Sequence, residues 1–81
     1  MTLLDKLETI GRAKPGTRML VCEPLLAVRN QEGGEIKLPI GTKLEVTFAI
    51  GSCVSAVADL NERLVPVTLF VDHYHMVEIE L

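Results

Sequence analysis

The segment 72–75 holds a close group of residues that could bind a metal ion together. His73 and His75 flank a tyrosine, so in an extended segment both imidazoles project to the same side, as a His-x-His metal pair requires. Asp72 would add an oxygen ligand, but a third or fourth ligand would have to come from a distant cysteine or carboxylate. A polar turn with exposed imidazoles is the simpler interpretation, and a metal site at Asp72, His73 and His75 is the alternative.

Nucleophilic catalysis would need Cys53 or Ser52 beside one of these histidines, with Asp72 to orient the imidazole. Nothing in the spacing of the residues brings these groups together, and thiols are common in aliphatic cores. Gly33 and Gly34 lack the Lys-Ser/Thr that follows the glycines of a phosphate-binding loop. The sequence therefore favours a non-enzymatic protein and predicts no cofactor.

A short amphipathic helix is predicted over residues 3–11. Thr2 followed three residues later by Asp5 resembles a capping box with Asp in place of Glu, and Gly11 supplies a C-terminal stop. A helix of about nine residues is not stable alone in water, so its apolar face must dock on the following sheet or on a neighbouring chain. That face consists of Leu3, Leu4, Leu7 and Ile10.

From residue 18 onwards the apolar pattern changes to a period of two, and β-branched residues become frequent, which is typical of strands. Turns rich in Gly, Pro and Asn separate six candidate strands. These are Met19–Val28, Glu35–Leu38, Lys43–Ile50, Cys53–Leu60, Leu64–Val71 and Met76–Leu81.

Three of these candidates carry specific expectations. Pro24 removes a backbone donor from the middle of Met19–Val28, which predicts an edge position or a bulge. Leu64–Val71 is apolar on both faces except for Thr68, so it is predicted to be covered on both sides. Lys43–Ile50 alternates cleanly and is predicted to place four apolar residues on one face, namely Leu44, Val46, Phe48 and Ile50.

The order of these elements resembles the SH3-like small barrels. The resemblance covers residues 18–81 and is carried by Leu38–Thr42 leading into Leu44–Val46, a hairpin, and Val65–Val67 before a late strand. Independently of the resemblance, short strands at this spacing are typical of small barrels and sandwiches, and we predict a mainly β fold, a partly open barrel of five or six antiparallel strands behind a short N-terminal helix. The length of 81 residues leaves room for one core, so we expect a single domain over residues 1–81. The aromatic groove of peptide-binding SH3 domains has no counterpart, because the aromatic residues are only Phe48, Phe70 and Tyr74.

The apolar content is high for so short a chain. Hydrophobic residues make up 48% of the 81 residues and aromatic residues only 4%, so aliphatic side chains form the core. A small barrel has a high ratio of surface to volume and cannot hide all of them. We therefore expect a homo-oligomer or a docked protein partner, with contacts from Leu3, Leu4, Leu7, Ile10 and the strand around Pro24.

Charge and cysteine content indicate which classes of partner and which cellular compartment to expect. The formal net charge is −3 and the eight Lys and Arg residues are scattered, so nucleic-acid binding is not expected. No stretch is long and apolar enough to span a bilayer, and no signal peptide is evident, so we expect a cytoplasmic protein with no membrane contact. Cys22 and Cys53 are then predicted to be reduced thiols in apolar surroundings.

Together these features predict a non-enzymatic β-barrel interaction module that self-associates or docks on a larger protein complex. The alternative is an oligomeric barrel that binds a small molecule or a metal ion through the segment of His73 and His75.

Overall fold

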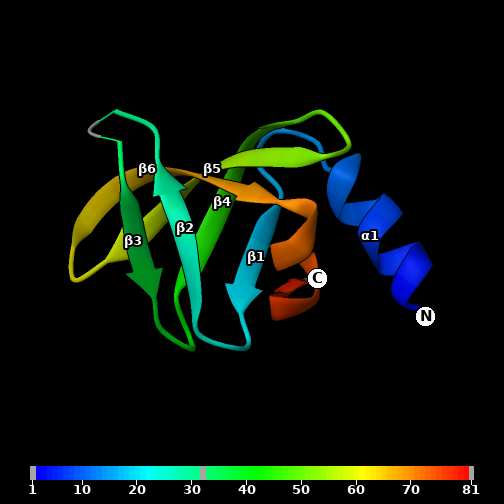
Figure 1. Ribbon diagram of the computed structural model, residues 1–81, viewed down its shortest axis with the longest axis horizontal. Coiled ribbons are helices and arrows are strands. Elements are labelled where there is room, and N and C mark those ends of the chain that lie inside the picture. The colour runs from blue at the N-terminus through cyan, green and yellow to red at the C-terminus, as the bar shows by residue number, and fades with distance from the viewer. Residues whose placement is uncertain (1, 32, 81) are drawn as a thin grey trace.

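The computed structural model describes residues 2–31 and 33–80, apart from the side chain of Leu3. One helix, seven strands and a 3-10 helix follow one another along the chain (Figure 1). They are α1 (Leu3–Gly11), β1 (Arg18–Val21), β2 (Leu25–Arg29), β3 (Glu35–Leu38), β4 (Lys43–Ala49), β5 (Cys53–Leu60), β6 (Arg63–Phe70), η1 (Val71–Met76) and β7 (Val77–Ile79).

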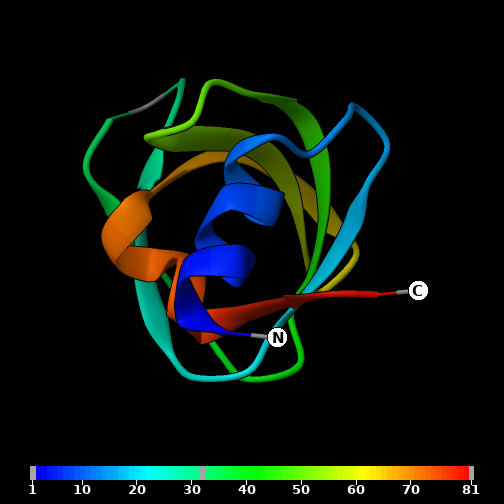
Figure 2. The same cartoon turned by 90° about the vertical axis from the view of Figure 1, so that its right-hand side faces the viewer.

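The seven strands form one antiparallel sheet in the order β3-β2-β6-β5-β4-β1-β7. The sheet curls around a core of aliphatic side chains, and its edge strands β3 and β7 do not pair with each other. The view along the barrel places α1 in front of one end (Figure 2). The predicted fold class, a mainly β, partly open barrel behind a short helix, is confirmed.

The chain forms one strand more than predicted because Met19–Val28 is broken. Residues 22–24 connect β1 to β2, and the backbone N–H groups of Cys22 and Glu23 both donate to the carbonyl oxygen of Met76, at 2.7 and 3.2 Å. Pro24 follows with no N–H to donate. The prediction of an edge strand or a bulge at Pro24 is wrong, because β1 and β2 both lie inside the sheet and its edges are β3 and β7.

The helix α1 begins and docks as its sequence dictates. The Thr2 hydroxyl accepts from the Asp5 N–H and the Asp5 carboxylate accepts from the Thr2 N–H, which confirms the capping box. Ile10 is fully buried and Leu7 packs against the same core, so the helix covers one end of its own barrel. Ile10 is therefore part of this chain's core, and its predicted role as a contact for a partner is wrong.

A β-bulge divides β4. Leu44 and Val46 face the core as predicted, but the register with β5 shifts between Val46 and Phe48. One extra residue moves every later side chain to the opposite face of the sheet. Phe48 is consequently 51% exposed, and the prediction that it shares a face with Leu44 and Val46 is wrong.

Strand β6 is covered on one face only. Val67 and Leu69 are fully buried in the barrel, whereas Leu64 and Phe70 on the outer face are 72% and 44% exposed. The prediction that this segment is covered on both sides is not met within this chain, because the chain offers no second layer outside β6 in its described residues. The outer face of β6 therefore exposes large apolar side chains to solvent.

Candidate interaction surface

The segment predicted as a metal site folds as the 3-10 helix η1, not as an extended strand. In a 3-10 helix, side chains two residues apart do not project to the same side. The prediction that His73 and His75 face the same side assumed an extended segment and is therefore corrected. The His73 Nδ1 accepts a hydrogen bond from the Phe70 N–H at 3.2 Å, while His75 is exposed. No group of three or more His, Cys, Asp or Glu side chains that could hold a metal ion exists among the described residues, so Asp72 adds no site.

Tyr74, which lies between the two histidines, has a structural role at the end of the barrel covered by α1. Its ring is fully buried and its hydroxyl donates to the carbonyl oxygen of Gly51 at 2.9 Å. Burial, with a smaller contribution from nearby Cys53, raises the pKa of Tyr74 to about 12. The phenol therefore ties η1 to the turn between β4 and β5 and stays neutral in the folded protein.

Alkaline pH is expected to destabilise the fold through Tyr74. The unfolded phenol loses its proton near its ordinary value of 10.0, while the folded one holds it to about 12, so stability falls between these pH values. By pH 11 the loss amounts to about 1.4 kcal/mol. Urea unfolding from pH 8 to 11 measures it, with Tyr74→Phe as the reference that lacks the group. Equal losses in both proteins would contradict the assignment to Tyr74.

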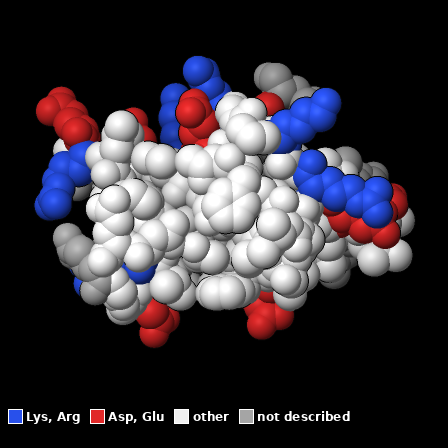
Figure 3. Space-filling view, turned by 90° about the horizontal axis from the view of Figure 1, so that it is seen from above, with Lys and Arg blue, Asp and Glu red and all other residues white. Residues whose placement is uncertain are grey.

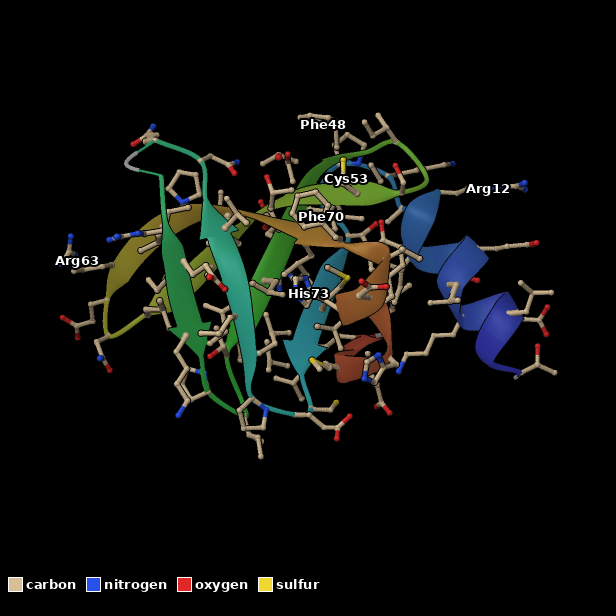
Figure 4. All side chains as sticks on the ribbon, in the orientation of Figure 1. Arg12, Phe48, Cys53, Arg63, Phe70 and His73 are labelled. Atoms are coloured by element: carbon tan, nitrogen blue, oxygen red, sulfur yellow. The ribbon has the colours of Figure 1, made fainter. Side chains whose placement is uncertain are left out.

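The most distinctive surface lies on the outside of β4, β5 and β6, where they approach the β4–β5 turn. We call it the outer patch and define it by four apolar side chains, Phe48, Ile50, Cys53 and Phe70. Phe48, Cys53 and Phe70 gather on the upper side of the barrel (Figure 4). Seen from above, the middle of this face carries no charged side chain, and Lys, Arg, Asp and Glu stand mainly at its margins (Figure 3).

The backbone ladders hold the outer patch in place. Phe70 pairs with Cys53 across β6 and β5, and Phe48 pairs with Ser55 across β4 and β5. The hydroxyl of Thr47, the residue at the bulge, donates to the carbonyl oxygen of Ser55 at 3.0 Å. The His73 ring lies 6.3 Å from that of Phe70, centroid to centroid. The two phenylalanines are thus fixed on either side of β5 before any partner binds.

The residues predicted to contact a partner do not form this surface. Leu4 is 65% exposed on α1, Leu7 is half-buried, and the side chain of Leu3 lies outside the described residues. Pro24 is exposed in the β1–β2 connection, which lies at the lower side of the barrel in Figure 1, away from the β4–β5 turn. Sequence reasoning missed Phe48 and Phe70, although the two-faced apolar run of β6 was a signal for the latter.

The two cysteines are free, as predicted, but both are half-buried, whereas the sequence predicted buried core thiols. The Cys22 thiol donates to the carbonyl oxygen of Leu20 at 3.6 Å, and burial, with Glu78 nearby, raises its pKa. A raised thiol pKa disfavours the thiolate, so Cys22 is a poor nucleophile.

No protein family, curated protein or solved structure matches this chain. Among the described residues, no helix has the length and apolar character needed to cross a membrane.

Proposed function

We propose that this protein is a non-enzymatic interaction module whose outer patch binds the outer patch of a second copy of the chain. The observation that carries the proposal is the exposure of two aromatic side chains, Phe48 and Phe70, on β4 and β6, the two strands that flank β5 in the sheet. Aromatic residues dominate the energetics of protein interfaces, and contiguous apolar patches on a small protein mark interaction sites. The free thiols of Cys22 and Cys53 support a cytoplasmic location for the assembly.

A second copy fits the patch because its centre is uncharged. Each chain has a formal net charge of −3, so two copies repel over most other orientations, whereas a contact between uncharged patches keeps charged side chains at the rim. A two-fold axis through the patch would bring identical surfaces together, as in most homodimers. A standard interface of about 800 Å² per partner would take roughly 15% of the 5208 Å² surface of this chain.

Removal of both aromatic side chains is expected to dissociate the dimer. In Phe48→Ser/Phe70→Ser the loss of two central aromatic contacts weakens self-association at least tenfold, or about 1.4 kcal/mol. Sedimentation equilibrium over a concentration series measures the dissociation constant. Stability of the monomer should change little, because both side chains are exposed on the outer face.

Leu64→Ser is the matched control, since Leu64 is the most exposed large apolar residue among those described and lies at the other end of β6 from Phe70. It should leave the dissociation constant unchanged. A wild-type protein that stays monomeric at high micromolar concentration would overturn the proposal, as would equal weakening by Leu64→Ser and by the double variant.

A further inference from the structure

A cavity of about 320 Å³ opens between the β5–β6 hairpin and edge strand β3. It has an apolar floor made by Ile36, Leu60 and Val65, three half-buried side chains that pack against the core. The β5–β6 hairpin lies at the end of the barrel opposite α1, which covers its own end with Ile10 (Figure 1). The mouths of β-barrels are common ligand sites, and this volume lies at the small end of the usual range of about 300–1,000 Å³. We call it the mouth.

The charged side chains among the described residues that line the mouth are basic, in a protein that is acidic overall. Two of the four arginines, Arg29 and Arg63, line the cavity, and none of its described lining residues is acidic. Glu62 lies in the adjoining turn without lining it. A second, smaller hollow of about 170 Å³ mixes both signs of charge, with Glu45, Asp59 and Glu80 beside its cations. Of these two hollows, the mouth is the one that combines an apolar floor with the exposed cation Arg63 and no acidic residue among its described lining.

The two arginines have different environments. The Arg29 Nε donates to the carbonyl oxygen of Gly33 at 3.2 Å, which fixes its side chain against the β2–β3 connection. Arg63 is exposed, and within the described part of the chain its side chain makes no hydrogen bond or ion pair. Figure 4 shows it at the end of the barrel opposite Arg12. An anion entering the mouth would therefore bind first to the Arg63 guanidinium.

We propose that the mouth binds a small amphipathic monocarboxylate. The apolar part of the ligand lies on Ile36, Leu60 and Val65, and its carboxylate accepts hydrogen bonds from the planar guanidinium of Arg63. The side-chain amide of Asn61, which also lines the cavity, offers a further donor. Neither half of the site is sufficient alone, because the floor is small and the ion pair contributes little unless the apolar part of the ligand shields it from water.

Octanoate is the probe, because it has both an apolar chain for the floor and a carboxylate for Arg63. Titrated into the ¹⁵N-labelled protein, it should give saturable shifts of the amide signals of Ile36, Leu60 and Val65. Acetate, which lacks the apolar part, and 1-octanol, which lacks the charge, should each bind at least tenfold more weakly. Arg63→Gln should weaken octanoate binding at least tenfold, whereas Arg12→Gln, which removes the same charge at the other end of the molecule, should change it less than twofold.

Three results would overturn the proposal. These are the absence of saturable shifts at the mouth, octanol binding as tightly as octanoate, and equal weakening by Arg63→Gln and Arg12→Gln. Shifts centred on Phe48 and Phe70 instead would place the ligand on the outer patch and also contradict it. The test is independent of dimer formation, since Phe48→Ser/Phe70→Ser leaves every residue of the mouth in place and should bind octanoate with unchanged affinity.

Discussion

Replacement of Ile10 by alanine is expected to lower the free energy of unfolding by about 2–5 kcal/mol. Ile10 is fully buried on α1, and it fills the end of the barrel where Tyr74 is also buried. Truncation removes apolar area from the core and leaves a cavity that the surrounding ladders cannot close. Because small domains have only about 5–15 kcal/mol of stability, this loss would bring the protein close to unfolding.

Leu4→Ala is the matched control, because it shortens an aliphatic side chain on the same helix that is 65% exposed. It should change the free energy of unfolding by no more than about 0.5 kcal/mol. Urea denaturation of the three proteins at a concentration that keeps them monomeric measures both values. Similar small losses from Ile10→Ala and Leu4→Ala would show that α1 does not dock on its own barrel in solution.

The helix and the fold class were predictable because their causes are local or periodic. The Thr2–Asp5 capping box is a contact within one turn, and the period of two after residue 18 reports one buried face per strand. The order of the strands was not predictable, since β2 pairs with β6 and β1 with β7 across distances that no local pattern encodes. The break at Pro24 was visible, but not whether it bends a strand or ends one.

The candidate sites were harder to predict than the fold. Phe48 reached the surface because one extra residue at Thr47 reverses the alternation, and a bulge leaves no mark in an otherwise regular strand. The predicted pairing of His73 with His75 assumed an extended backbone, but this segment forms the 3-10 helix η1. Arg29 and Arg63 stand 34 positions apart in sequence and line one cavity only because β2 pairs with β6. Each of these outcomes depends on tertiary pairing.

A methyl group added at Gly11 is expected to destabilise the protein by about 2 kcal/mol, the range typical of overpacking. An ideal Cβ on Gly11 would lie 2.6 Å from the carbonyl oxygen of Gly51, far inside van der Waals contact. That oxygen accepts the hydrogen bond from Tyr74, and the Gly51 N–H donates to the Gly11 carbonyl at 2.8 Å. The extra methyl group therefore pushes apart the end of α1 and the β4–β5 turn.

Whether Gly11→Ala destabilises or stabilises the protein distinguishes the effect of packing from that of helix propensity. Alanine is more favourable than glycine in a helix by up to about 1 kcal/mol, so propensity alone predicts that Gly11→Ala stabilises the protein. The difference in stability between Glu8→Gly and Glu8→Ala, at an exposed position of the same helix, measures the Gly-to-Ala propensity contribution without the contact. Because Tyr74 and Gly11 meet at the same oxygen, the cost of Gly11→Ala should also shrink in Tyr74→Phe, where Gly51 is freer to move. Stabilisation by Gly11→Ala in urea denaturation would show that α1 ends away from the β4–β5 turn.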